Sequence, residues 1–137
     1  MASINVNSYI KKILIINGIG DIIVGIMLLF FLNQLAVILS FPTMDEISYL
    51  SGGWGIAAIS FGLLRLFAGL QSDFKLMWFV AIFGVIEGTI LTIFGFVIDL
   101  TTSLTFVQVS MSTLFALFFA VTYGLGFILR QTQKNSA

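Results

Sequence analysis

Three ionisable residues stand inside long apolar stretches of this 137-residue chain: Asp21, Arg65 and Glu87. A charged side chain near the centre of a bilayer costs at least about 2.5–3.5 kcal/mol on insertion scales, so it is expected to be paired and to face away from lipid. A guanidinium group carries a planar fork of donors that suits two carboxylates at once. These residue types therefore predict an internal network in which Arg65 bridges Asp21 and Glu87.

Polar residues near these charges could join the network: Asn17, Thr89, Thr92 and Tyr123. The chemistry open to such a network is carboxylate acid–base chemistry, binding of a lipophilic or protonated ligand, or docking of a partner protein. Two other interpretations stay open. The Arg65 side chain could extend to the inner interface, or the network could be structural and fix the register of the helices.

The residue types that the chain lacks exclude several kinds of chemistry. There is no cysteine, which excludes disulfides, thiolate nucleophiles, iron–sulfur clusters and thiolate-bound zinc. There is no histidine, which removes the usual haem and metal ligand and the commonest general base. We therefore expect no metal centre and no haem in the chain itself, assign no catalytic residue, and favour a function other than catalysis.

Composition places the chain in a membrane. Hydrophobic residues make up 59% and charged residues 9%, and the mean hydropathy is +1.13. A soluble domain carries roughly a quarter charged residues to cover its surface. Six acids balance six bases, so the chain also lacks the basic face that nucleic acid requires. The sequence indicates one integral membrane domain over residues 1–137, with the lipid bilayer as its surroundings.

Long apolar segments define the predicted architecture, because a helix needs roughly 20 apolar residues to cross the hydrocarbon core. Four segments qualify: 13–32, 47–70, 76–98 and 104–129. They predict an all-α, up-down-up-down four-helix bundle. Residues 35–41 either extend the first helix or lie along the outer interface. Thr43 to Glu46 reads as a capping box that opens the second span.

Basic residues in the connections set the predicted orientation, because short cytoplasmic connections are rich in lysine and arginine. The bases that flank the spans all fall on one side, where both termini also lie: Lys11, Lys12, Lys75, Arg130 and Lys134. Both termini are therefore expected in the cytoplasm. Some aromatic residues lie near the same inner ends and are expected to anchor the helices at the interface: Tyr9, Trp78 and Tyr123.

The expected depths of the three charged residues, and the small residues near them, favour one common polar layer. Counted from the nearest expected interfacial residue at 1.5 Å per residue, Asp21 and Arg65 lie about 12–13 Å deep and Glu87 about 18 Å deep. Each of the three follows a glycine by three positions. Small residues let helices in lipid approach closely, so we expect these positions to form the packing stripes: Gly18, Gly25, Gly55, Gly62, Gly69, Gly84, Gly88, Ala116, Ala120 and Gly124.

Short glycine-rich motifs carry a family resemblance: Gly52-Gly53-Trp54-Gly55, Gly62-Leu63-Leu64-Arg65 and Ile86-Glu87-Gly88. With these motifs and its four-span layout, the chain resembles the DoxX-like group of small bacterial and archaeal membrane proteins. Some members of that group are described as subunits of quinone-linked oxidoreductases. The resemblance implies an accessory subunit or a quinone-adjacent protein in the plasma membrane of a prokaryote, and it assigns no catalytic residue.

Three functional classes follow from these observations, of which the third, an intramembrane enzyme, has only carboxylate acid–base chemistry available. The first is a non-catalytic accessory or assembly subunit of a larger membrane complex, favoured by short connections and the lack of a soluble domain. The alternative is a small carrier or binder of a lipophilic or protonated ligand, for example a quinone, at the cluster of Asp21, Arg65 and Glu87. The expected partners are other subunits or further copies of the chain, with a bound lipid or quinone in place of a resident cofactor.

Overall fold

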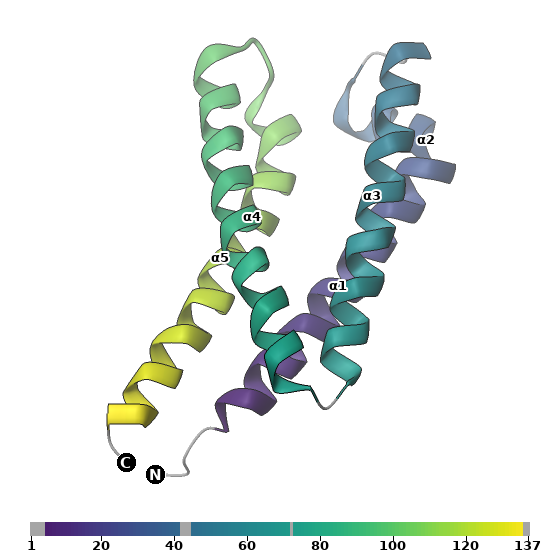
Figure 1. The fold of residues 1–137 in the computed structure, drawn as a ribbon. Helices are drawn as coiled ribbons and strands as arrows, with labels where there is room; N and C mark the ends of the chain where they lie inside the picture. Colours follow the sequence, from purple (N-terminus) through teal and green to yellow (C-terminus); the bar gives the residue numbers. More distant parts are fainter. Residues whose placement is uncertain (1–4, 42–44, 72, 136–137) are drawn as a thin grey trace.

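The computed structural model describes residues 5–41, 45–71 and 73–135, and these residues form helices and short connections without a strand (Figure 1). The helices are α1 (Val6–Phe30), α2 (Leu32–Leu39), α3 (Asp45–Leu70), α4 (Phe74–Thr101) and α5 (Phe106–Asn135). All except α2 are long and apolar enough to cross a membrane. The predicted all-helical class and the four membrane-span-capable helices are confirmed.

The first helix starts well before the predicted boundary at residue 13. Asn5 caps it, because its side-chain oxygen accepts a hydrogen bond from the backbone N–H of Ser8 at 3.2 Å. Val6, Ile10 and Leu14 then follow at a spacing of four residues and are buried in the core. Polar residues and lysines cover the other faces of this segment, so its average composition concealed the apolar stripe.

The short helix α2 settles one of the two alternatives for residues 35–41. They do not extend α1, because Phe31 leaves the helical conformation (φ −126°, ψ 23°) and a separate helix begins at Leu32. Ser40 ends α2 in the left-handed region with a φ of 55°. The predicted capping box begins at Thr43, which lies outside the described residues.

Close contacts between small residues join the long helices into two antiparallel pairs. In the first pair, Gly18 on α1 lies against Gly62 on α3, and Gly25 lies against Gly55. The residue number of the contact falls along α3 as it rises along α1, so the two helices run in opposite directions. In the second pair the backbone of α4 at Gly88 touches α5 at Ala116 and Ala120, as the small-residue stripes predict.

Gly124 is the exception among the predicted packing residues. In the described part of the chain, a Cβ at this position would meet no atom within 4 Å, whereas one at Gly126 would meet Ile10 on α1 at 2.3 Å. A series spaced strictly by four residues turns 400° per step and drifts around the helix. The contact face of α5 combines steps of three and four residues instead, and it passes through these buried positions: Val109, Thr113, Ala116, Phe119 and Tyr123.

The two pairs converge where both chain termini lie and diverge towards the other end (Figure 1). We call residues 5–21, 62–71, 73–87 and 119–135 the closed half, and the remaining described residues the open half. The buried hydrophobic cluster lies within the closed half: Val6, Ile10, Leu14, Ala68, Met77, Trp78, Val80, Ala81, Phe119 and Tyr123. Large side chains from α1, α4 and α5, together with Ala68 from α3, therefore hold the pairs together in the closed half.

We call the diverging parts of the two helix pairs the arms. Gln108 links the two arms in the open half. Its side-chain amide nitrogen donates to the backbone oxygen of Ser40 at 3.0 Å, which joins the start of α5 to the end of α2. Its side-chain oxygen accepts from the backbone N–H of Thr105 at 2.8 Å. This link is exposed and polar, in contrast to the apolar core of the closed half.

Candidate functional site

Arg65 lies between two carboxylates from two other helices. Its Nη1 donates to Oδ2 of Asp21 on α1, and its Nη2 donates to Oε2 of Glu87 on α4. The Arg65 side chain is 7% exposed. It therefore does not extend to the interface, and the interpretation of Arg65 as an interfacial side chain is wrong. One guanidinium connects three helices, as the sequence predicts.

The two carboxylates of Arg65 differ in exposure. The Asp21 side chain is 13% exposed and the Glu87 side chain is 37% exposed. The two ion pairs leave one negative charge in excess, because two carboxylates face one guanidinium. Asp21 is enclosed by the helix pair to which it belongs. Glu87 is the member of the trio that a group from outside the chain can reach.

A second polar contact lies beside the trio. The Asn17 side chain donates through Nδ2 to the hydroxyl oxygen of Tyr123 at 3.1 Å, and both residues are buried. Asn17 stands one turn before Asp21 on α1, so both side chains leave the same face of that helix. The predicted network residues thus form one polar layer, made of Asn17, Asp21, Arg65, Glu87 and Tyr123.

The glycines that precede the charges make this layer possible. A Cβ on Gly18 would lie 2.7 Å from the backbone oxygen of Gly62, and one on Gly62 would lie 2.7 Å from that of Gly18 and 3.1 Å from Cβ of Asp21. A Cβ on Gly84 would lie 2.5 Å from the ring of Tyr123. Side chains at these positions would separate the helices and pull the ion pairs apart.

Two threonines and two aromatic residues differ from the sequence expectations. Thr92 donates to the oxygen of Gly88 in its own helix, and Thr89 is exposed, so neither joins the layer. Trp78 and Tyr123 are buried in the core instead of anchoring the helices at an interface. Their polar atoms find partners inside the protein, which removes the reason to place them at the headgroups.

Sequence reasoning missed the partners of Trp78. Its indole nitrogen donates to Oδ1 of Asn7 at 3.2 Å, and Cζ of Arg130 lies 4.2 Å from the centroid of its ring. In the sequence, Arg130 indicates only the orientation of the helices in the membrane. The positions of Asn7 and Arg130 near the two ends of the chain carry no local signal that links them to Trp78.

The polar layer lies where the two arms part. The core residues of α1, α3 and α4 stand on the terminal side of the layer, from Ile10 and Leu14 to Ala68 and Ala81. Beyond the layer, the close contacts of Gly25, Gly55, Gly88 and Gly95 are made within each pair, Gln108 makes a polar link between the pairs, and the arms diverge (Figure 1). In the described part of the chain, no group of three or more acids gathers in a way that could hold a metal ion.

Four membrane-span-capable helices around a buried ion-pair layer fit a small polytopic membrane protein. No protein-family model matches the chain, and no characterised protein or solved structure matches it either. The resemblance to the DoxX-like group stays a prediction. Of the motifs that carry it, Gly52 and Gly53 face open space, whereas Gly55 packs against Leu29.

Proposed function

We propose that this protein is a non-catalytic accessory or assembly subunit of a larger membrane protein complex, and that the partner contacts it at Glu87. The observation that carries the proposal is the partial exposure of this carboxylate inside the membrane-span-capable part of α4. A carboxylate open to hydrocarbon is costly, so a neighbouring donor stabilises it. A polar side chain on a partner helix supplies such a donor.

The shape of the protein supports a partner at this position. The core fills the closed half, and the arms diverge from the polar layer onwards (Figure 1). Large apolar side chains on the diverging arms are exposed, among them Ile56 on α3 and Phe94 on α4. Between helices in lipid, packing and interhelical hydrogen bonds drive association. A partner helix that meets both an apolar face and Glu87 gains both contributions.

The proposed orientation places both termini in the cytoplasm of a prokaryote, with the chain in the plasma membrane. The five bases that flank the spans belong to the first turns of α1 and α4 and the last turns of α5, on the side of the termini, whereas α3 begins at Asp45 and Asp99 lies in the last turn of α4, at the other end of these helices. Basic residues in short connections remain on the cytoplasmic side. The polar layer then lies towards the cytoplasmic side of the bilayer midplane.

The experiment is purification of the tagged full-length chain from its own membranes in mild detergent, with quantification of co-purifying chains. Glu87→Gln removes the excess charge but leaves the ion pair between Arg65 and Asp21, so the variant is expected to fold. Asp99→Asn, on the same helix outside the polar layer, is the matched control. We expect a stoichiometric partner with the wild type and the control, and much less of it with Glu87→Gln. A partner retained equally by all three would contradict the proposal.

The second candidate function is binding of a lipophilic or protonated ligand such as a quinone. The same exposed carboxylate favours it, because Glu87 can accept a hydrogen bond from a hydroxyl group of the ligand. This function predicts a homogeneous homo-oligomer that carries extractable quinone or lipid and no partner chain. Glu87→Gln would then lower the ligand content of the purified protein, and Asp99→Asn would not.

A further inference from the structure

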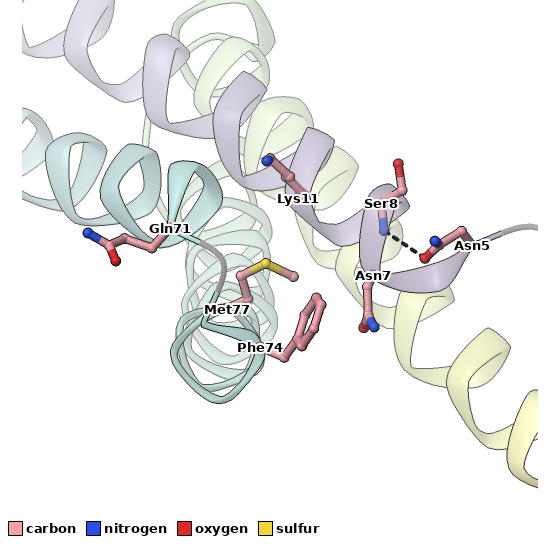
Figure 2. A pocket seen from close by; sticks show the side chains of 7 residues that line it. All are labelled: Asn5, Asn7, Ser8, Lys11, Gln71, Phe74 and Met77. Carbon is pink, nitrogen blue, oxygen red and sulfur yellow. Dashed lines mark hydrogen bonds between the residues drawn. The ribbon is translucent and has the colours of Figure 1, made fainter.

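A small cavity opens between the start of α1 and the connection from α3 to α4, away from the polar layer (Figure 2). Its volume is about 240 Å³, and its lining residues are Asn5, Asn7, Ser8, Lys11, Gln71, Phe74 and Met77. Pockets for drug-sized ligands usually measure about 300–1,000 Å³. The cavity therefore suits a compact group and not a whole cofactor.

The polar wall of the cavity presents hydrogen-bond donors. Oδ1 of Asn5 accepts from the backbone N–H of Ser8, and Oδ1 of Asn7 accepts from the indole N–H of Trp78. Backbone and indole N–H groups can only donate, so these contacts fix the orientation of both amides. The NH₂ groups of the two asparagines are thus left as donors. Lys11 adds an ammonium group to the same wall.

No acid is among the described residues that line the cavity. Asp73 precedes Phe74 in sequence, but its side-chain oxygen caps α4 by accepting from the backbone N–H groups of Lys75 and Leu76. One cation and several donors, without a carboxylate in the lining, favour an anion. The acceptors in the lining, such as the Gln71 amide oxygen and the Ser8 hydroxyl, are neutral, so no carboxylate there balances a cationic ligand.

The opposite wall of the cavity is apolar. The ring of Phe74 and the thioether of Met77 come from the first turn of α4 and face the space below Lys11 (Figure 2). A site with donors on one wall and hydrocarbon on the other matches the junction between a phosphate and a glycerol or acyl group. The cavity also lies at the end of the protein where the flanking bases gather, and such ends attract anionic lipids.

We infer that this cavity binds the phosphate of an anionic phospholipid headgroup. Lys11 is the charge partner of the phosphate, and the amide of Asn7 donates a hydrogen bond to it. Phe74 and Met77 contact the glycerol and the first methylene groups. The inference does not depend on the partner proposed for Glu87, because the two sites share no residue.

The test is native mass spectrometry of the full-length chain in detergent micelles with added phosphatidylglycerol or phosphatidylcholine. Lys11→Gln removes the charge in the cavity. Lys12→Gln is the matched control, because its side chain is also exposed but does not line the cavity. We expect one bound phosphatidylglycerol per chain. Its affinity should fall about fivefold to tenfold with Lys11→Gln, because one direct charge contact is lost, and less than about twofold with Lys12→Gln.

A second variant keeps the fold and reverses the chemistry of the wall. Asn7→Asp retains the oxygen that accepts from Trp78 but replaces the NH₂ donor with a carboxylate oxygen, so binding of phosphatidylglycerol should fall by more than with Lys11→Gln. Equal effects of the two lysine variants, or equal binding of phosphatidylcholine, would overturn the inference. Inorganic phosphate that displaces the lipid at similar concentration would reassign the cavity to a soluble phosphate compound and would also overturn it.

Discussion

The closed and open halves are held together by different kinds of contact. In the closed half, large side chains from α1, α4 and α5 interlock, with Ile10, Leu14, Met77 and Tyr123 fully or almost fully buried. In the open half, close backbone approach joins the helices within a pair, as at Gly25, where a Cβ would lie 2.6 Å from the backbone oxygen of Gly55. Glycine contacts thus make the pairs, and large side chains join the pairs to one another.

The polar layer lies at the boundary between these two modes of packing. Arg65 forms ion pairs with both arms, since Asp21 belongs to the first pair and Glu87 to the second. The trio therefore acts as a cross-link between the arms at the point where the apolar core ends. A site at such a boundary is both rigidly held from one side and accessible from the other.

Removal of the cross-link should have the largest effect on stability. Arg65→Met leaves two carboxylates without their partner in an apolar region, and loss of one partner of a buried pair costs about 3–5 kcal/mol. We expect a loss of this size in the free energy of unfolding, measured by denaturant titration in micelles.

A neutral version of the layer is the control for that variant. The triple variant Asp21→Asn, Arg65→Met and Glu87→Gln carries no charge in the layer, so it should recover most of the lost stability. A triple variant as unstable as Arg65→Met would mean that the shape of Arg65, and not the pairing of its charge, matters.

Glycine contacts within a pair should give the next largest effect. Gly18→Ala places a methyl group 2.7 Å from the backbone oxygen of Gly62, and overpacking of this kind costs about 1–3 kcal/mol. Gly124→Ala, where the methyl group meets open space, should leave the free energy of unfolding unchanged or slightly raised. Equal losses at both positions would contradict the assigned helix faces.

The hydrogen bond between Asn17 and Tyr123 should contribute less. Tyr123→Phe removes the acceptor of a buried amide, and we expect a loss of about 1 kcal/mol in the free energy of unfolding. Tyr49→Phe changes a side chain that is 83% exposed and should have no measurable effect. An unchanged stability in the Tyr123 variant would mean that the bond adds nothing to the closed half.

The exposed link in the open half should contribute least. Gln108→Ala removes its bond to the backbone of Ser40, and an exposed neutral hydrogen bond is worth about 0.5 kcal/mol or little more. We expect a loss of that order in the same titration. A loss as large as that of Gly18→Ala would show that the open half is held as firmly as the closed half.

Much of the fold follows from the sequence, and the reasons are physical. Long apolar runs specify the spans, and lipid forces Arg65, Asp21 and Glu87 to find one another. The segment from Val6 to Lys12 escaped prediction, because Val6 and Ile10 among polar neighbours look like a flank. The divergence of the arms also escaped, since it depends on which large side chains meet between pairs, and no local pattern encodes that.

Within the site, too, only some of the contacts between side chains could be predicted from the sequence. The residue types of the trio imply mutual pairing, so the charged contacts could be predicted from chemistry alone. The contact of Trp78 with Asn7 and Arg130 could not, because it joins residues from three helices whose mutual rotation is set by the whole core. The difference in exposure between Asp21 and Glu87 likewise exists only in the assembled helices.

Distances between spin labels test the divergence of the arms most directly, and the absence of natural cysteine makes paired labelling simple. One pair, Leu64→Cys with Ile86→Cys, lies beside the polar layer, and the other, Leu50→Cys with Leu100→Cys, lies about 21 Å further along both helices. All four side chains are exposed. We predict a clearly longer distance for the second pair. Equal distances would describe a parallel, closed bundle and would contradict the account.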